Sequence, residues 1–306
     1  MGKNLSHQNA SGRRTTGEPS QTQAQTPTTI VITGASDGIG AAAARQLAGT
    51  GVRLLVVGRS PEKTAAVARE IDAEHFIADF ARLDDVRRLA AELSAATAEH
   101  GIDVLANNAG GIFGDRTPTL DGFEKTLQVN HLAPFLLTTL LLPRLLPGGA
   151  SVVNTSSMAN RLFGHLDLSD LGNERRYSPR KAYGDAKLAN VLFTRSLHAK
   201  FHDQGLSSAA FHPGLVRTSF SAGSASSMRW FYQSPLARLA PMISPEQGGA
   251  TLAWFLTGVP GSTWTSGRYY DQDRPTTRVN PQADDLALAE GLWQRSAELV
   301  GLSPAR

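Results

Sequence analysis

Short runs of apolar, often β-branched residues alternate with helical patterns from residue 27 onwards. Runs of this length that end in Gly, Asn or Ser predict buried strands, and the longer segments between them predict helices. The expected strands are 29–34, 52–58, 75–80, 102–110, 150–157, 206–214 and 267–271. The expected helices are 41–51, 60–71, 81–101, 121–146 and 181–203.

This alternation predicts an α/β fold with one doubly wound parallel sheet of about seven strands, flanked by helices. Strands that are covered on both faces are continuously apolar, as these are. Ligands of such sheets bind beyond the carboxyl ends of the strands. The residues that follow those ends here are polar or conformationally special: Gly34, Gly58, Asp79, Asn107, Ser157 and Pro213.

The first 26 residues are rich in Ser, Thr, Gln and Gly and hold few large apolar side chains. Such a segment buries too little surface to offset the entropy of ordering, so we expect a disordered tail over 1–26. We expect a single domain over 27–306, because no linker or internal repeat divides that range.

Composition excludes several classes of function. The chain has no cysteine, which excludes disulfides and thiolate metal sites, and we expect no metal. The net charge is +3 over 306 residues, and the scattered basic residues form no nucleic-acid stripe. The most apolar run, 132–146, is interrupted by Pro134, Pro143 and Arg144 and is too short to span a membrane. With no apolar core of a signal peptide, we expect a cytoplasmic protein.

A glycine-rich loop lies between the first predicted strand and helix, with the sequence TGASDGIG at 33–40. Glycines permit a tight turn and close approach of the backbone to a pyrophosphate, and the helix N-terminus offers unpaired N–H groups to it. The loop is therefore a candidate dinucleotide site, with an ordinary strand-to-helix turn as the alternative. Its spacing is G-x-x-x-G-x-G rather than G-x-G-x-x-G.

Six motifs in order make the sequence resemble the short-chain dehydrogenase/reductase family, over about residues 28–275. They are T-G-x-x-x-G-I-G at 33–40, N-N-A-G at 107–110, Asn130, Ser157, Y-x-x-x-K at 183–187, and H-P-G at 212–214 followed by Thr218. The segments KLANVLFTRSL and HPGLVRTSF are most similar to the retinol-dehydrogenase-like branch and its bacterial ketoreductase relatives. The resemblance implies a single-domain Rossmann fold and an oxidoreductase that interconverts an alcohol and a ketone or aldehyde.

The resemblance also implies a set of cofactor contacts, some of which chemistry refines. Family members that prefer NAD carry an acidic residue at the end of the second strand, whereas this chain has Arg59, whose guanidinium can bind a 2′-phosphate. We therefore expect NADP(H), with NAD(H) as the alternative. Asp37 argues in the opposite direction unless it caps the following helix. The implied cofactor residues are Gly34, Ser36, Asp37, Gly38, Ile39, Gly40, Arg59, Asp79, Phe80, Asn107, Ala109, Gly110, Tyr183, Lys187, Pro213, Gly214 and Thr218.

Reduction of a carbonyl needs a proton donor beside the hydride donor. Tyr183 and Lys187 lie four residues apart and share a helical face, and a nearby ammonium favours the phenolate form of a tyrosine. The resemblance implies that Ser157 binds and polarises the carbonyl oxygen, and that Lys187 binds the nicotinamide ribose. It also implies that Asn130 holds a proton-relaying water, which makes Asn130, Ser157, Tyr183 and Lys187 the expected catalytic residues.

Two rivals to these residues stand nearby. Tyr177 and Lys181 form a second Y-x-x-x-K, but Pro179 lies between them and predicts that residues 177–179 precede the helix, so that the two side chains do not share a helical face. Ser156 is the alternative to Ser157, and we expect it to point to the sheet side or to contact the cofactor backbone.

A loop at 158–179 and a lid at 215–245 are expected to shape the substrate pocket. Their apolar side chains predict a hydrophobic carbonyl or alcohol substrate, with contacts from Met158, Phe163, Trp230 and Phe231. In many relatives the two long helices form a dimer surface, so the protein is expected to be a monomer or a homodimer. The main competing function is a non-catalytic NADP(H) sensor or scaffold. A sugar-nucleotide epimerase would need G-x-x-G-x-x-G, which this loop does not have.

Overall fold

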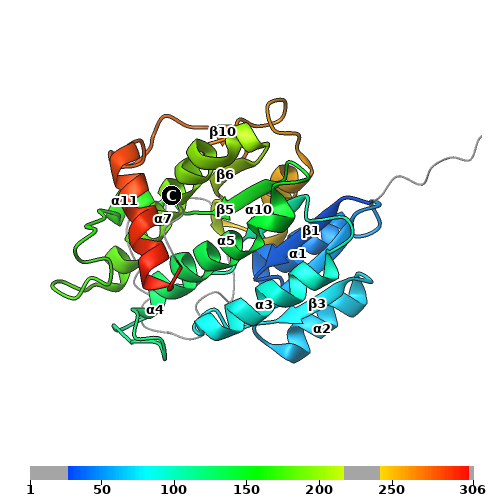
Figure 1. The fold of residues 1–306 in the computed structure, drawn as a ribbon, viewed down its shortest axis with the longest axis horizontal. Coiled ribbons are helices and arrows are strands. Elements are labelled where there is room, and N and C mark those ends of the chain that lie inside the picture. The colour runs from blue at the N-terminus through cyan, green and yellow to red at the C-terminus, as the bar shows by residue number, and fades with distance from the viewer. Residues whose placement is uncertain (1–26, 217–241, 303–306) are drawn as a thin grey trace, which may run out of the picture.

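A mainly parallel sheet of eight strands forms the centre of the molecule, in the order β10-β9-β6-β5-β4-β1-β2-β3 (Figure 1). The computed structural model describes residues 27–216 and 242–302. The strands of this sheet are β1 (Thr29–Thr33), β2 (Arg53–Gly58), β3 (Glu74–Ile77), β4 (Val104–Asn107), β5 (Ser151–Thr155), β6 (Ser207–His212), β9 (Arg268–Asp271) and β10 (Arg274–Pro275). Two further short strands, β7 (Leu215–Val216) and β8 (Met242–Ile243), pair with each other.

Helices cover both faces of the sheet (Figure 1). They are α1 (Gly38–Leu47), α2 (Pro61–Glu70), α3 (Leu83–Ala96), α4 (Lys125–Leu127), the π-helix η1 (Gln128–Leu132), α5 (Ala133–Leu145), α6 (Ala159–Phe163), α7 (Pro179–Phe201), the 3₁₀ helix η2 (His202–Gln204), α10 (Pro245–Thr257) and α11 (Leu286–Leu299). Side chains of α3, α5, α7 and α11 form one apolar core with the sheet, and those of α1 and α10 form a second core on the other face.

Alternation along β1 shows how one strand serves both cores. Val31 belongs to the core under α3 and α5, whereas Ile30 and Ile32 belong to the core under α1 and α10. All three side chains are fully buried. A strand that is buried on both faces needs apolar residues at every position, which is why the predicted strands appeared as unbroken apolar runs.

The helix starts follow the local sequence signals. Ser60 accepts a hydrogen bond from Lys63 N at the start of α2, with Pro61 as its first residue. Ser178 does the same for Lys181 N at the start of α7, again followed by a proline. In each helix a side-chain oxygen satisfies one of the unpaired N–H groups of the first turn.

Several predicted boundaries were wrong. The helix expected over 121–146 begins at Lys125 and contains a π-helical turn, and the segment 158–179 holds the short helix α6. The sheet has an eighth strand, β10, which pairs antiparallel to β9. It is a two-residue edge strand containing Pro275, and a pattern that short cannot be recognised as a strand.

The helix α11 lies along α7 on the outer side of the α5 and α7 layer (Figure 1). Its Trp293 is 4% exposed and packs edge-on against Phe135 of α5, with 5.0 Å between ring centroids. The same indole lies 5.8 Å from the ring of Phe193 and 5.9 Å from that of Phe201, both on α7. The last helix is therefore part of the main core rather than an appendage.

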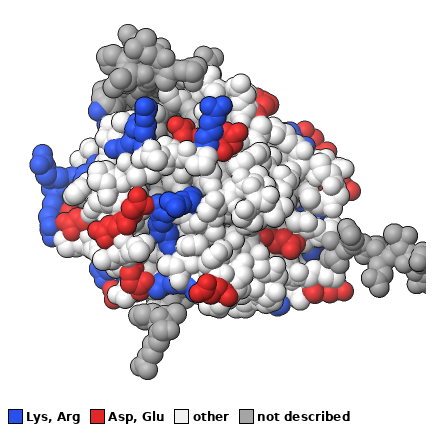
Figure 2. Space-filling model, turned by 90° about the horizontal axis from the view of Figure 1, so that it is seen from above, with Lys and Arg blue, Asp and Glu red and all other residues white. Residues whose placement is uncertain are grey.

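Charged side chains are mixed by sign on the molecular surface. On the face drawn in Figure 2, Lys and Arg lie among Asp and Glu rather than in a continuous stripe. No helix within residues 27–216 and 242–302 combines the length and the apolarity that crossing a bilayer requires.

Candidate active site

The glycine loop joins β1 to α1 at the carboxyl edge of the sheet. Gly34 and Gly38 have φ values of +69° and +58°, which side-chain-bearing residues rarely adopt. A Cβ at Gly40 would lie 2.4 Å from Gly34 O, so only glycine lets the first turn of α1 sit this close to the strand end. These backbone features fit a loop that approaches a pyrophosphate.

Asn108 fastens this loop to β4, and the sequence analysis did not single it out. Its Nδ2 donates to Thr33 O at 3.0 Å, and its backbone N–H donates to Thr33 Oγ1 at 3.0 Å. A Cβ at Gly34 would lie 2.8 Å from Cα of Ala109, so the loop and the N-N-A-G segment are in direct contact. The second asparagine of the N-N-A-G motif could have indicated this role from the sequence.

The two asparagines of this motif face different ways. Asn107 is 2% exposed, and its Nδ2 donates to Thr138 Oγ1 and Asn154 Oδ1, both at 2.9 Å. Its side chain therefore ties β4 to β5 and α5 beneath the site. If Asn107 lines the adenosine side, as expected, only its backbone can make that contact.

Asp37 caps the N-terminus of α1, which is the role that would reconcile this acidic residue with NADP(H) binding. Its Oδ1 accepts the N–H of Gly38 at 2.7 Å, and its Oδ2 lies 3.5 Å from Nζ of Lys63. Both side chains of this ion pair are about half exposed, so the pair itself is weak. Lys63 still places a positive charge beside the acidic residue of the glycine loop, which the sequence analysis had not considered.

Arg59 follows β2 directly beside the glycine loop. A Cβ at Gly58 would lie 2.8 Å from Cβ of Ser36, so the end of β2 and the loop are packed together. The Arg59 side chain is exposed and has no hydrogen-bond or ion-pair partner within the described residues. A guanidinium that is not engaged by protein groups is available to a phosphate.

Asp79 and Phe80, the residues expected near the adenine, differ in the exposure of their side chains. Asp79 is partly exposed, and its Oδ1 accepts the N–H of Ala81 at 3.0 Å in the turn after β3. Phe80 is 5% exposed, and its side chain belongs to the main apolar core. The ring of Phe80 therefore packs inward, and the prediction that Phe80 contacts the cofactor can apply only to its backbone.

Asn130 lies in the π-helical turn between α4 and α5. Its side chain is fully buried, and it donates from Nδ2 to Gly111 O at 2.8 Å and to Thr126 O at 2.9 Å. Its Oδ1 accepts Gly111 N at 3.1 Å. A π-helical turn interrupts the regular hydrogen bonds of a helix and occurs frequently at functional sites. Here it brings Asn130 to the backbone after β4.

The neighbour of Asn130 connects this turn to α11. His131 Nε2 lies 2.8 Å from Ser296 Oγ, and both side chains are buried. Burial lowers the pKa of His131 to about 4, because the charged imidazolium would lose its hydration there. The bond is therefore one between neutral groups at neutral pH.

Tyr183 and Lys187 face the same region from α7. Both are buried, and Nζ of Lys187 lies 5.6 Å from the centroid of the Tyr183 ring. The Lys187 ammonium donates to Thr155 O at 3.1 Å. A Cβ at Gly110 would lie 2.5 Å from Asn130 Oδ1 and 3.1 Å from Lys187 Nζ, so three distant segments meet at that glycine.

Burial lowers the pKa of Lys187 to about 7 from its ordinary 10.5. An isolated ammonium in a low-dielectric site loses hydration that one carbonyl contact does not replace. A bound anion would raise that pKa again by favouring the charged form. The positive charge of Lys187, which would favour the phenolate form of Tyr183, therefore depends on whether an anionic ligand is bound.

We expect the nucleotide-free protein to gain stability through Lys187 as pH rises above about 7. The unfolded lysine keeps its proton to near 10.5 and the folded one loses it near 7, so the unfolded state binds more protons between those values. The variant Lys187→Met removes this titration. Its unfolding free energy relative to wild type should be highest below about pH 7 and fall steadily towards about pH 10, as measured by denaturant unfolding. A difference that does not change with pH would contradict the lowered pKa.

Ser157 follows β5 and is partly exposed. Its Oγ accepts the N–H of Ala159 at 3.2 Å. The rival Ser156 is 2% exposed, and its Oγ donates to Lys187 O at 2.8 Å. Ser156 therefore joins the strand end to the backbone of α7, away from any ligand, and Ser157 is the serine whose side chain remains on the open side.

Tyr177, the second tyrosine, precedes α7. Its hydroxyl donates to Gly114 O at 2.9 Å and lies 3.5 Å from Oε1 of the buried Glu124. Burial and the nearby carboxylate raise the pKa of Tyr177 to about 12. The residue connects two loops, and its raised pKa makes it a poor proton donor to substrate.

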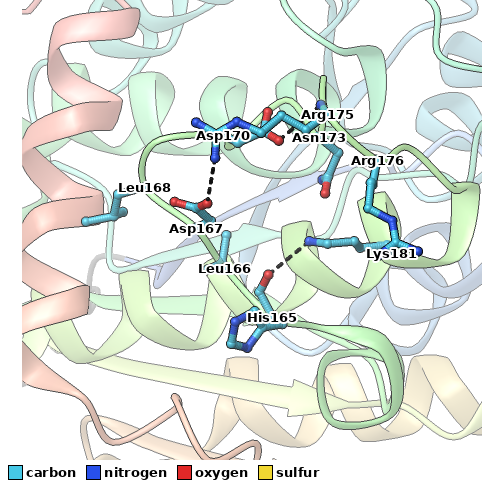
Figure 3. A pocket seen from close by; sticks show the side chains of 9 residues that line it. All are labelled: His165, Leu166, Asp167, Leu168, Asp170, Asn173, Arg175, Arg176 and Lys181. Carbon is cyan, nitrogen blue, oxygen red and sulfur yellow. Dashed lines mark hydrogen bonds and ion pairs between the residues drawn. The ribbon is translucent and has the colours of Figure 1, made fainter.

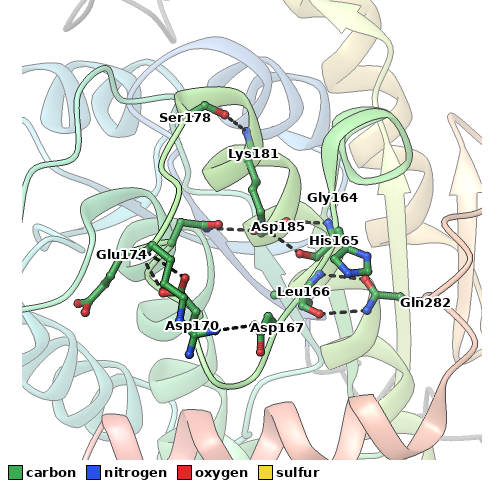
Figure 4. A network of polar contacts seen from close by, with 12 residues as sticks. Gly164, His165, Leu166, Asp167, Asp170, Glu174, Ser178, Lys181, Asp185 and Gln282 are labelled. Carbon is green, nitrogen blue, oxygen red and sulfur yellow. Dashed lines mark hydrogen bonds and ion pairs between the residues drawn. The ribbon is translucent and has the colours of Figure 1, made fainter.

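The segment after α6 is fixed by the buried carboxylate of Asp185 on α7 (Figure 4). Asp185 accepts His165 N at 2.7 Å, Asn173 Nδ2 at 2.9 Å and Lys181 Nζ at 2.5 Å. The segment also borders a hollow of about 540 Å³ that is open to the surface (Figure 3). None of the expected catalytic residues lines this hollow, which is bordered by His165, Leu166, Asp167, Leu168, Asp170, Asn173, Arg175, Arg176 and Lys181.

Only some of the remaining predicted residues lie within the described part of the chain. Pro213 is buried after β6, and Gly214 has a φ of +100°. Met158 and Phe163 are partly exposed at either end of α6. Thr218, Trp230, Phe231 and most of the expected lid lie outside the described residues. Within the described ranges, no group of three or more His, Asp or Glu side chains is arranged to hold a metal.

Comparison with known proteins decides the family. A family model described as short chain dehydrogenase matches residues 28–229. The chain belongs to the short-chain dehydrogenase/reductase family. It is therefore an oxidoreductase that acts on CH–OH and C=O groups with a nicotinamide dinucleotide.

The relatives lie in the retinol-dehydrogenase-like and ketoreductase branch of the short-chain dehydrogenases. A Streptomyces protein named as a daunorubicin C-13 ketoreductase is 41% identical, over 89% of this chain and 92% of the relative. Human retinol dehydrogenase 12 is 38% identical, over 89% of this chain and 86% of the relative.

Solved structures of the family share the fold. An uncharacterised protein from Mycobacterium paratuberculosis is 33% identical with a TM-score of 0.71, over 92% of this chain and 97% of that one. A gluconate 5-dehydrogenase-like protein from Beutenbergia cavernae, solved with bound NADP, is 27% identical with a TM-score of 0.61, over 81% and 95% of the two chains.

Proposed function

We propose that this short-chain dehydrogenase/reductase interconverts a hydrophobic ketone or aldehyde and its alcohol with NADP(H), with Tyr183 as the acid and base. The observation that carries the proposal is the meeting of Asn130, Lys187 and Gly110 at one point beside Tyr183. Relatives named for a ketone reduction and for retinol support the substrate class.

We assign parts of the cofactor to the described residues as follows. The glycine loop and the N-terminus of α1 would hold the pyrophosphate, Arg59 the 2′-phosphate, and Lys187 the nicotinamide ribose. When bound, the nicotinamide supplies or accepts the hydride. Tyr183 would donate the proton to the carbonyl oxygen, and Ser157 would stabilise the negative charge that grows on it.

Apolar side chains lie on the segments that follow β4 and Ser157. The Phe113 ring packs beside Gly111, where a Cβ would lie 3.0 Å from it, and Gly111 is the backbone partner of Asn130. Leu162 on α6 is 48% exposed, one turn beyond Met158. These side chains favour a hydrophobic substrate over a phosphorylated or sugar substrate.

The placement of α11 supports a monomer. In many relatives the helices equivalent to α5 and α7 pair with a second subunit. Here Trp293 of α11 packs against both helices and fills part of that face with the chain's own side chains. We propose that the enzyme functions without a partner at this surface.

Arg59 is expected to set the preference for NADPH. The wild-type dissociation constant for NADPH should be at least about tenfold below that for NADH, a difference of about 1.4 kcal/mol. The variant Arg59→Ala should lose this preference while its affinity for NADH stays the same. Arg69→Ala is the matched control, because Arg69 lies on the exposed surface of α2 and hydrogen-bonds within its own helix.

Fluorescence titration of the purified proteins with each nucleotide measures both constants. Equal affinities of the wild type for NADPH and NADH would refute the assignment of Arg59. A protein that binds neither nucleotide would remove the basis of the proposed function.

A further inference from the structure

The short helix α6 begins at Ala159, two residues after Ser157, and it has five residues. A helix of this length is unstable by itself, because nucleation costs more than its few hydrogen bonds return. Its geometry, and that of Ser157, must therefore be fixed by side-chain contacts in addition to its own backbone hydrogen bonds.

Asn160 is the first of these side chains, and it is 1% exposed. Its Nδ2 donates to the backbone carbonyl of Ser157 at 2.5 Å and lies 3.5 Å from Ser156 Oγ. Ser156 in turn donates to Lys187 O. One buried amide thus contacts the backbone of the expected carbonyl-binding serine and, through Ser156, the turn of α7 that carries Lys187.

Asn280 is the second, and it comes from the segment between β10 and α11. It is 3% exposed, and its Nδ2 donates to Asn160 O at 2.6 Å and to Gly164 O at 2.8 Å. Its Oδ1 accepts Gln282 N at 2.8 Å, which orients the amide so that the nitrogen faces α6. Asn160 O also accepts the N–H of Gly164 at 3.1 Å, so Asn280 adds a second donor to that carbonyl and donates to the carbonyl of Gly164, the residue that follows the helix.

Gln282 makes a similar contact farther along the segment. Its Oε1 accepts Leu166 N at 2.9 Å, and its Nε2 donates to Leu166 O at 3.0 Å (Figure 4). It holds the chain beyond α6 but contacts neither Asn160 nor the serine pair. Substitution of Gln282 therefore tests how the loop beyond α6 is held, whereas substitution of Asn280 tests how α6 and Ser157 are held.

We propose that Asn160 and Asn280 are positioning residues that fix the Ser157 hydroxyl relative to Tyr183 and Lys187. The inference rests on the proposed function, in which Ser157 binds the carbonyl oxygen. Displacement of a binding group by a fraction of an ångström to about 1 Å lowers the rate of a reaction by up to about a hundredfold. Loss of the Asn280 donors releases the end of α6 and, through Asn160, the backbone of Ser157.

The test uses a change that keeps the shape of the side chain. Asn280→Asp retains the acceptor for Gln282 N but turns an oxygen towards two carbonyls. We expect kcat for the reduction of daunorubicin with NADPH to fall about 10- to 100-fold, with the dissociation constant of NADPH unchanged. Relative to wild type, kcat should recover as the pH is lowered, because a protonated carboxyl can again donate one hydrogen bond.

The matched control is Gln282→Glu, the same chemical change in a residue that contacts the segment only beyond α6. Its kcat should stay within about twofold of wild type. Equal losses in the two variants, or an unchanged kcat in Asn280→Asp, would overturn the inference. If Asn280→Asp does not fold, Asn280→Ala removes both donors without repulsion and takes its place.

A second measurement does not depend on turnover. Hydrogen exchange of the amides in 157–164 should speed up in the Asn280 variant and not in Gln282→Glu, and equal exchange would contradict the proposal. The Tyr183→Phe variant distinguishes failure of the positioning role from failure of the proposed function. If it is inactive while Asn280→Asp retains full activity, only the positioning role fails; if it is fully active, the proposed function fails.

Discussion

Tyr183→Phe is expected to lose about 10²- to 10⁴-fold in kcat for carbonyl reduction, the range that a positioned general acid contributes. The phenyl ring preserves packing in a buried position but has no proton to donate. The affinity for NADPH should change by no more than a few-fold, because the substitution removes one hydroxyl from the expected cofactor contacts and leaves the glycine loop, Arg59 and Lys187 untouched. Stopped-flow or steady-state measurement of NADPH consumption, with a hydrophobic ketone or aldehyde that the wild type reduces, gives the rate.

Tyr177→Phe provides the matched control, since the chain carries a second tyrosine ahead of a lysine at the same spacing. Its hydroxyl contacts Gly114 O and not the site, so kcat should stay within a few-fold of wild type. Unchanged activity in Tyr183→Phe together with tight NADPH binding would instead support a non-catalytic nucleotide sensor.

Trp293→Ala is expected to lower the free energy of unfolding by about 3–5 kcal/mol, the usual cost of deleting a large buried aromatic side chain. The indole contacts the rings of Phe135, Phe193 and Phe201, which would face a cavity once it is removed. Urea unfolding followed by circular dichroism measures the change through the midpoint at constant slope.

Leu286→Ala on the same helix is the control for this experiment. Leu286 is 65% exposed, so its truncation should alter stability by no more than about 0.5 kcal/mol. A comparably small effect at Trp293 would show that α11 adds little to the core, and it would also remove the support for a monomer.

The strands and the glycine loop could be predicted because their signals are local. Unbroken apolar runs such as β1 and β5 reflect burial on both faces, and Gly34 and Gly38 have positive φ values that the loop needs. Pro179 also indicated that Tyr177 precedes the helix, and the structure agrees. The boundary itself was wrong, because α7 begins at Pro179, two residues before the expected start at 181, with the proline as its first residue.

Features that depend on partners distant in sequence could not be predicted. The π-helical turn at Asn130 has no local pattern, and it is stabilised by Gly111, 19 residues away. Asn280 reaches across 120 residues to α6, and nothing near it in the sequence suggests that role. The inward packing of Phe80 likewise depends on the core that surrounds it.

The position of α11 has a consequence for how this enzyme is made. The strand β6 pairs with β9, and Trp293 fills the core from residues that are synthesised still later. While the chain emerges from the ribosome, the apolar faces of α5 and α7 therefore remain uncovered until α11 has appeared. Contacts this distant in sequence slow folding and leave aggregation-prone surface exposed in the meantime. Folding of this protein is thus expected to finish after translation, and the nascent chain is a natural client for chaperones.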